Sequence, residues 1–381
     1  MPIFPRRLSI IAARCVVVLV LIASPQLWAQ GCTPVPLSKD HPTKDLCYGK
    51  EFWIEPGLNG GPRIQAFDFY AATGDGPRPL VIWAHPNEKT KAIPIGSELY
   101  QALVEPALDA GFSLASIEFR HPVVNADLAD SATNPGVPHY DVARALQFIR
   151  ANAEALGIDP RNVFFVGKSR GALALWTALQ DDMADPYSHD PVARQSTRVN
   201  AVFGYNMQTT YRGSEFADLF IVPGDRAEFN AIFEAENPKY LQYGSAIASV
   251  NGSGLYPDPP VMLRYGGAIV PRQLTVEEMF AQDEIHYPNF GPALCQAYLR
   301  AFGNPGRCSY VADPRLEGDA KASFDGYIEF FKTYLRRRPA PVLPALLQGC
   351  GDLGGSCLKP RVLRPAQSGR PSRTTTRPGT R

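Results

Sequence analysis

One serine in the chain has the surroundings of a nucleophile. Ser169 is the centre of residues 167–171, a G-x-S-x-G pentapeptide. The apolar residues 163–166 before it predict a buried strand, and the alanine- and leucine-rich residues after it predict a helix. A serine on so sharp a strand-to-helix turn is exposed for attack, and the two glycines leave room where strand and helix pass. The alternative is a tight turn with a solvated serine.

The elements around this turn predict a doubly wound, mostly parallel α/β sheet. Further strands are predicted at 63–70, an edge strand, and at 79–85, 112–119, 199–205, 261–265 and 307–311. Helices are predicted at 97–110, 139–156, about 227–236 and 321–335. Nearly continuous apolar strands that alternate with helices are typical of a sheet covered on both faces. Residues 206–260 are polar, aromatic and irregular, which predicts an insertion over the active-site face.

The two ends of the chain differ in composition from this region. Arginines before an apolar run at 15–23, with Ala29 as the last residue before cleavage, predict a signal peptide over 1–29. The run is too short for a stable membrane span. Residues 30–335 are predicted to be the folded domain, and residues 336–381 a Pro/Arg-rich, largely disordered tail. We therefore expect an exported protein, periplasmic or secreted.

The cysteines favour the same compartment. Six remain after the predicted signal peptide, in three close pairs: Cys32, Cys47, Cys295, Cys308, Cys350 and Cys357. This spacing favours three local disulfides formed in an oxidising compartment, although six cysteines allow fifteen pairings. Acylation of Cys32, which would anchor the protein to a lipid, is the alternative for that residue.

Composition also limits the partners. The 38 Lys and Arg residues nearly balance the 37 Asp and Glu residues, leaving a net charge of +1. So small a charge favours neither nucleic acid nor an anionic membrane as a partner. No metal-ligand spacing and no phosphate-binding glycine loop is present, so neither a metal nor a cofactor is predicted.

Taken together, residues 60–335 resemble the α/β-hydrolase superfamily, in particular its serine-esterase and prolyl-oligopeptidase-like group. The pentapeptide, the strand 80–85, the strand–helix unit 141–157 and the strand 259–263 carry the resemblance. It implies acyl transfer from an ester or amide to water. A serine attacks, a histidine takes and returns the proton, and a carboxylate orients the histidine.

The sequence departs from the family order of serine, then acid after the seventh strand, then histidine after the eighth. No histidine follows His286, which lies in the loop after the seventh strand, 261–265. We expect His286 to approach Ser169 as the base, with Asp283 or Glu284 orienting it. The alternative is that His286 caps the helix that begins near residue 291 or packs in its loop.

The resemblance also implies an oxyanion hole. Its first donor would be the backbone N–H of Arg170, and its second would come from the loop after the third strand. That loop holds His85 and Pro86, where the family often has His-Gly-Gly. Because proline has no N–H, we expect Asn87 to supply the second donor through its backbone or side-chain amide. The side chain of Arg170 is expected to be solvated or paired at the rim; the alternative is that it faces the pocket and binds an acidic group of the substrate.

Several other residues are candidates for the site. His85 and His121 are candidate substrate-binding residues, although His85 could instead shape its loop. His121 and His139 flank the loop after the fourth strand, and either could be an unusual base. Asp218 and Asp225 follow the sixth strand and are reserve candidates for the acid, although aspartates in polar loops usually form turns.

Two functions follow from these residues. The first is an exported serine hydrolase that cleaves a small-molecule or polymer ester, with a peptidase as a less favoured variant. The second, motivated by the departures in the triad, is an α/β-hydrolase fold without catalytic activity that acts as a binding protein. An imidazole within hydrogen-bond reach of the Ser169 hydroxyl separates the two.

Overall fold

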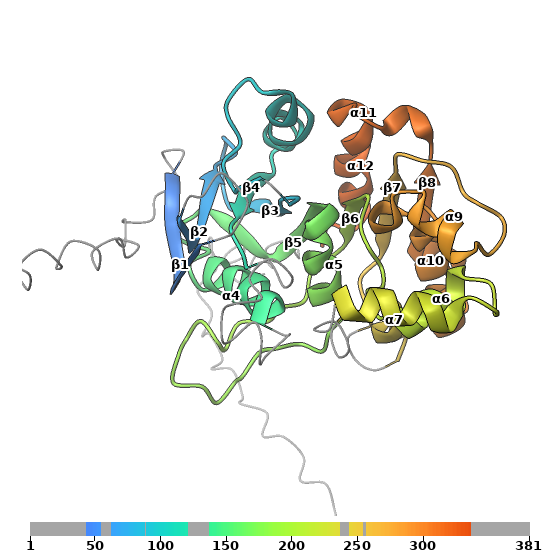
Figure 1. Ribbon diagram of the computed structural model, residues 1–381. Coiled ribbons are helices and arrows are strands. Elements are labelled where there is room, and N and C mark those ends of the chain that lie inside the picture. The colour runs from blue at the N-terminus through green and yellow to red at the C-terminus, as the bar shows by residue number, and fades with distance from the viewer. Residues whose placement is uncertain are drawn as a thin grey trace, which may run out of the picture. The chain divides into compact units, whose positions relative to one another are not determined.

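Eight strands form one sheet in the order β1-β2-β4-β3-β5-β6-β7-β8 (Figure 1). The structure is a computed structural model that describes residues 43–54, 62–87, 89–120, 137–236, 244–253 and 257–336. The predicted signal peptide and residues 337–381 of the predicted tail lie outside the described residues. The strands are β1 (Thr43–Ile54), β2 (Pro62–Tyr70), β3 (Arg78–Ala84), β4 (Ser113–Ile117), β5 (Ile158–Lys168), β6 (Val202–Tyr205), β7 (Val261–Tyr265) and β8 (Cys308–Ala312).

The predicted mostly parallel sheet is confirmed. From β4 to β8 all neighbouring strands are parallel, whereas β2 is antiparallel to both β1 and β4. The prediction of β2 as the edge strand is wrong, because β1 lies outside it. The pairing of β1 with β2 shifts register twice, so the alternation of buried residues such as Leu46 and Tyr48 is interrupted along the sequence.

Successive strand residues belong to two cores, one on each face of the sheet. Ile82 and Phe165 pack in one apolar cluster, and their neighbours Trp83 and Phe164 pack in the other. Side chains alternate between the two faces along a strand, so a strand in a sheet that is covered on both faces needs apolar residues at successive positions. This is the reason for the nearly unbroken apolar runs of β3 and β5.

Helices supply the outer layers of both cores. The first cluster includes residues of α4 (Val137–Ala151), α5 (Ala172–Ala178) and α10 (Phe290–Phe302). The second includes residues of the π-helix η1 (Tyr100–Val104), α2 (Glu105–Asp109), α11 (Ala320–Phe324) and α12 (Tyr327–Lys332). Figure 1 shows α4 and α5 on one side of the strands and α11 and α12 on the other.

Two helices differ from their predicted form. The predicted helix at 97–110 consists of η1 followed by α2 and ends before Gly111, whose φ is 78°. The predicted closing helix at 321–335 is two helices, because Gly326 between α11 and α12 also has a φ of 78°. A left-handed residue cannot continue a right-handed helix, and glycine adopts this conformation without a steric penalty.

The predicted insertion at 206–260 is more regular than expected. It contains α6 (Gly213–Phe220), α7 (Arg226–Glu236) and α8 (Ala246–Ser249). The aromatic side chains that made it look irregular belong to the core: Phe216 stacks on Phe229 of α7 at 4.7 Å and meets Phe290 of α10 edge to face at 5.5 Å. These helices pack beside the segment between β7 and α10.

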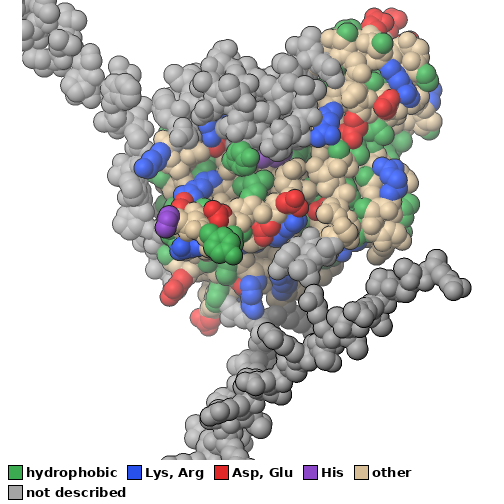
Figure 2. All heavy atoms as spheres, turned by 90° about the horizontal axis from the view of Figure 1, so that it is seen from below, with side chains coloured by type: hydrophobic (Ala, Val, Ile, Leu, Met, Phe, Trp, Pro, Cys, Tyr) green, Lys and Arg blue, Asp and Glu red, His purple; other side chains and the backbone are tan. Residues whose placement is uncertain are grey.

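A disulfide joins Cys295 of α10 to Cys308 at the start of β8, which confirms this predicted pair. Cys47 is also disulfide-bonded, while Cys32, Cys350 and Cys357 lie outside the described residues. No helix among the described residues is both long and apolar enough to cross a membrane. On the face shown in Figure 2, acidic and basic side chains alternate among apolar ones rather than forming a patch of one sign.

Candidate active site

Ser169 occupies the turn between β5 and α5. The strand ends at Lys168, a short 3-10 helix, η2, covers Ser169–Gly171, and α5 begins at Ala172. The φ angle of Ser169 is 51°, a value that residues other than glycine rarely adopt. Such a conformation stores strain and is typical of a serine held on a sharp turn.

The two glycines beside Ser169 are required by crowding. A Cβ at Gly171 would lie 2.2 Å from the carbonyl oxygen of Ala84, at the end of β3. A Cβ at Gly167 would lie 2.7 Å from the carbonyl oxygen of Gly171. Because both obstacles are backbone atoms, they cannot move aside as a side chain could. The turn therefore tolerates no larger residue at either position.

A chain of hydrogen bonds links Ser169 to a histidine and a carboxylate. The Nε2 of His286 lies 2.7 Å from the Ser169 hydroxyl oxygen, and its Nδ1 lies 2.6 Å from Oδ2 of Asp283. An ionised carboxylate only accepts, so Nδ1 carries the proton and Nε2 is left to accept from the serine hydroxyl. The hydrogen bond from His286 lowers the pKa of Asp283, which keeps that carboxylate charged.

Asp283 differs from a buried orienting acid in its exposure. Its side chain is 64% exposed, and that of His286 is 28% exposed. The two residues share η4 (Glu284–His286), in which Asp283 is the N-cap and accepts from the backbone N–H of His286 at 3.3 Å. Asp283 thus orients the histidine through both its ring and its backbone. Glu284, the other predicted acid, makes no hydrogen bond or ion pair with His286.

Hydrogen bonds fix the loop after β7 both before and after His286. Before it, α9 (Val276–Phe280) begins with a capping box formed by Thr275 and Glu278. After it, the side chain of Asn289 accepts from the N–H of Val270 at 2.9 Å and donates to the carbonyl of Val270 at 2.7 Å. The long loop after β7 is thereby closed on itself, which limits the positions open to the histidine.

The insertion also supports this segment. Tyr287, the residue after His286, is buried and meets Phe220 of α6 edge to face at 5.3 Å. The N–H of Leu274 donates to the carbonyl of Phe220 at 2.8 Å, and the carboxylate of Asp225 accepts from the N–H of Val276 at 3.2 Å. The helices of the insertion therefore hold the loop against the core beside Ser169.

The two candidate oxyanion donors come from different elements. Arg170 is the central residue of η2, and Asn87 is exposed in the loop after β3. The expectation that the Arg170 side chain is at the solvated rim is wrong: it is 6% exposed and donates to the carbonyl of Phe119. Its guanidinium also lies 4.7 Å from the Phe119 ring centroid, a cation–π distance.

Two of the other histidines, His85 and His139, have partners other than Ser169. His85 is buried, and its ring contacts Glu118 at 2.9 Å and the carbonyl of Pro86 at 2.8 Å, so neither ring nitrogen is open to a substrate. His139 is also buried and stacks on Trp176 of α5. His121 lies outside the described residues.

The reserve acids have other partners. Asp218 pairs with Arg226 at 2.8 Å, and Asp225 caps the start of α9. After β8, Asp313 pairs with Arg315 at 2.6 Å. Within the part of the chain that the structure describes, no group of three or more His, Cys, Asp or Glu side chains could hold a metal ion.

The sequence and the fold were compared with known proteins. The BD-FAE family model matches residues 67–211, which span β2 to the start of the insertion. A comparison with curated protein sequences gave no match. A bifunctional GH43-CE protein of Bacteroides eggerthii superimposes with a TM-score of 0.50 and 18% identity, over 78% of this chain.

This chain covers only 38% of the Bacteroides eggerthii protein. Two similar structures are matched over most of their own length. One is a truncated carbohydrate esterase from gut microbiota, with a TM-score of 0.47, 17% identity, and coverage of 77% of this chain and 98% of that one. The other is a propionate-bound thermophilic esterase of Thermogutta terrifontis, with a TM-score of 0.45, 18% identity, and coverage of 76% and 96%.

Proposed function

Because the chain belongs to the α/β-hydrolase superfamily, we propose that it is a serine hydrolase that cleaves a carboxylic ester by acyl transfer to water. The observation that supports this most is the hydrogen-bonded series Ser169–His286–Asp283, in which both distances are below 2.8 Å.

The proposed reaction has two halves, acylation of Ser169 and hydrolysis of the acyl-enzyme, and His286 and Asp283 have the same roles in both. His286 takes the hydroxyl proton of Ser169 as the oxygen attacks the ester carbonyl, and returns it to the leaving alcohol. Water then attacks the acyl-enzyme with the same base. Asp283 holds the imidazole in the tautomer that accepts at Nε2, and the amides of Arg170 and Asn87 stabilise the oxyanion.

The site differs from the usual family arrangement in the position of its base. Both the base and its acid come from the loop after β7, whereas the loop after β8 begins with the Asp313–Arg315 ion pair. The active site is the meeting point of all these loops, because parallel strands end on one edge of the sheet. A histidine from the neighbouring loop can therefore reach the same serine.

The test is labelling of the folded protein with a fluorophosphonate, together with hydrolysis of p-nitrophenyl acetate. Ser169→Ala should abolish both, and His286→Ala should lower both by at least about a thousandfold, the loss typical of a triad base. His189→Ala replaces an exposed histidine and is the matched control, with activity expected to be unchanged. A wild type that is folded but neither labelled nor active would instead support the non-catalytic binding protein.

We also propose that the protein is exported through cleavage of residues 1–29. The disulfide between Cys295 and Cys308 and the disulfide-bonded Cys47 support an oxidising compartment. The expected N-terminus of the mature protein is Gln30. N-terminal sequencing of the protein recovered outside the cytoplasm checks this, and an uncleaved or acylated N-terminus would contradict it.

A further inference from the structure

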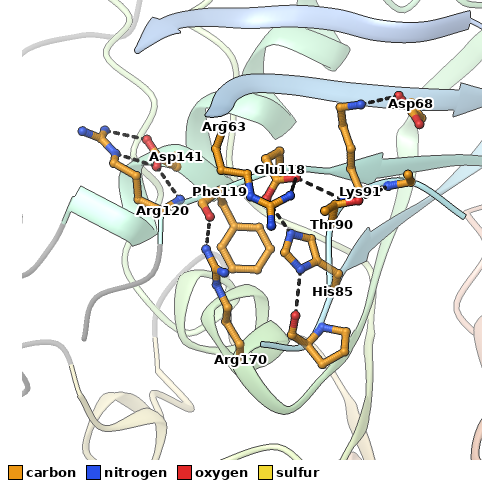
Figure 3. Close-up of polar contacts among 12 residues, drawn as sticks. Arg63, Asp68, His85, Thr90, Lys91, Glu118, Phe119, Arg120, Asp141 and Arg170 are labelled. Atoms are coloured by element: carbon orange, nitrogen blue, oxygen red, sulfur yellow. Dashed lines mark hydrogen bonds and ion pairs between the residues drawn. The ribbon is translucent and has the colours of Figure 1, made fainter. Parts of the chain in front are cut away.

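A buried carboxylate lies beneath the loop that carries Asn87. Glu118 follows β4, and its side chain is 3% exposed (Figure 3). Its Oε1 lies 2.9 Å from Nε2 of His85, and its Oε2 accepts from the backbone N–H of Lys91 at 3.2 Å. His85 and Lys91 lie on either side of Asn87 in the sequence. One carboxylate therefore holds the loop at two points.

The contact between His85 and Glu118 joins a ring nitrogen to an ionised carboxylate. Nδ1 of His85 faces the carbonyl oxygen of Pro86 at 2.8 Å, and a carbonyl only accepts, so Nδ1 carries a proton. Burial raises the pKa of Glu118, but the charge and hydrogen bond of His85, with Arg170 and Arg63, outweigh burial and lower it. The carboxylate is thus ionised, and it lies within hydrogen-bond distance of the His85 ring.

The loop is fixed further at its far end. The ammonium of Lys91 lies 2.8 Å from Oδ1 of Asp68 in β2 and 2.5 Å from Oδ1 of Asp45 in β1. These contacts connect the loop to the two antiparallel strands. Asn87, between the two held points, is exposed.

Arg170, whose backbone N–H is the first proposed oxyanion donor, is connected to the same end of β4. The guanidinium of Arg170 donates to the carbonyl of Phe119, the residue after Glu118, and lies over the Phe119 ring. The Phe119 ring in turn packs on the imidazole of His85 at 4.9 Å. Figure 3 shows the Phe119 ring between the guanidinium of Arg170 and the ring of His85, with Glu118 above His85 in this view. The two donor-bearing segments therefore share one support.

We propose that Glu118 is a positioning residue for the oxyanion hole: through the His85 ring and the Lys91 N–H, it holds Asn87 in place relative to Arg170. This inference rests on the proposed function. An oxyanion-hole donor contributes to the transition state and little to the binding of a neutral ester. Loss of the support should therefore lower kcat and leave KM nearly unchanged.

The test compares Glu118→Gln with a matched variant, Asp141→Asn. Asp141 is an equally buried carboxylate that accepts from Arg120 and Gln65 but does not contact the loop after β3. Glu118→Gln should lower kcat by about tenfold to a hundredfold, since a misplacement of about 1 Å can cost that much. KM should change by less than about threefold. Asp141→Asn should lower the Tm at least as much and leave kcat within about threefold of wild type.

Two further measurements separate positioning from general destabilisation. Deuterium uptake by the peptide covering the loop after β3 should rise in Glu118→Gln and not in Asp141→Asn. His85→Asn should lower kcat similarly, and the double variant with Glu118→Gln should be no worse than the poorer single variant, because both break one contact.

The outcomes distinguish this inference from the proposed function. A wild-type protein that is neither labelled nor active overturns both. An active wild type in which Glu118→Gln keeps its kcat, or in which Asp141→Asn loses as much kcat as Glu118→Gln, overturns the positioning role alone.

Discussion

The exposure of Asp283 leads to a quantitative prediction for Asp283→Asn. Asparagine has the same shape and still accepts from the His286 N–H, so the cap of η4 is kept while the negative charge is lost. What disappears is the charge-assisted hydrogen bond to Nδ1, 2.6 Å long. A hydrogen bond to a charged group contributes about 1.5–3 kcal/mol. Because the Asp283 side chain is 64% exposed, water can replace part of this interaction. We therefore take the loss on removing the charge as about 2 kcal/mol.

Since about 1.4 kcal/mol corresponds to a tenfold change in rate, this loss predicts a kcat about thirtyfold lower. A buried triad acid is worth far more, on the order of ten thousandfold. The assay is steady-state hydrolysis of p-nitrophenyl acetate together with the rate of fluorophosphonate labelling of Ser169. Both should fall by the same factor, because both need the histidine as base.

Glu284→Gln is the matched control, since Glu284 is the neighbouring carboxylate and makes no hydrogen bond or ion pair with His286. It should keep activity within about twofold of wild type. Equal losses in the two variants would mean that the general negative charge of η4 matters and that the hydrogen bond does not. A loss near ten thousandfold in Asp283→Asn would refute the argument that exposure limits the contribution of this acid.

Three further predictions concern stability. Gly171→Ala should abolish activity and lower the unfolding free energy, measured in urea, by several kcal/mol, because the new Cβ would lie 2.2 Å from a backbone oxygen. The control is Gly224→Ala, which should be nearly neutral because its Cβ meets nothing within 4 Å. Removal of the Cys295–Cys308 disulfide, with both residues changed to alanine, should lower the unfolding free energy by about 3 kcal/mol, the entropy of a loop with a sequence separation of 13; an unchanged urea midpoint would contradict this. Burial raises the pKa of Asp258 from its ordinary value near 4 to about 6. Between pH 4 and pH 6 this carboxyl therefore ionises only in the unfolded state, and the unfolding free energy should fall by up to about 3 kcal/mol as the pH rises through this range. Asp258→Asn should flatten this decline, and a decline of the same size in that variant would assign it to another group.

Much of the fold could be predicted from the sequence because the sheet is covered on both faces. Unbroken apolar runs then mark the strands directly, and the predicted strand at 261–265 coincides with β7. β1 was missed because its two register shifts break the alternation that identifies a strand with one buried face. The break at Gly326 was missed because a glycine within a helical pattern does not reveal whether its φ is positive.

The sequence likewise predicts some features of the candidate site and leaves others open. The sequence by itself determined the strained turn, because two glycines around a serine between a strand and a helix allow few other conformations. It also limited the base to a few histidines, since none follows His286. Asp283 and Glu284 stayed equivalent candidates, because both lie within three residues of the histidine.

Only the tertiary structure decided which of these groups meet. The contact between Ser169 and His286 spans 117 residues, and it depends on how the loop after β7 is closed by Asn289 and supported by α6. The contacts of Glu118 likewise connect β2, β3, β4 and the turn after β5, and no local sequence pattern predicts them. Local sequence determines backbone conformation over a few residues, whereas the distance between two side chains far apart in the chain is set by the packing of the elements between them.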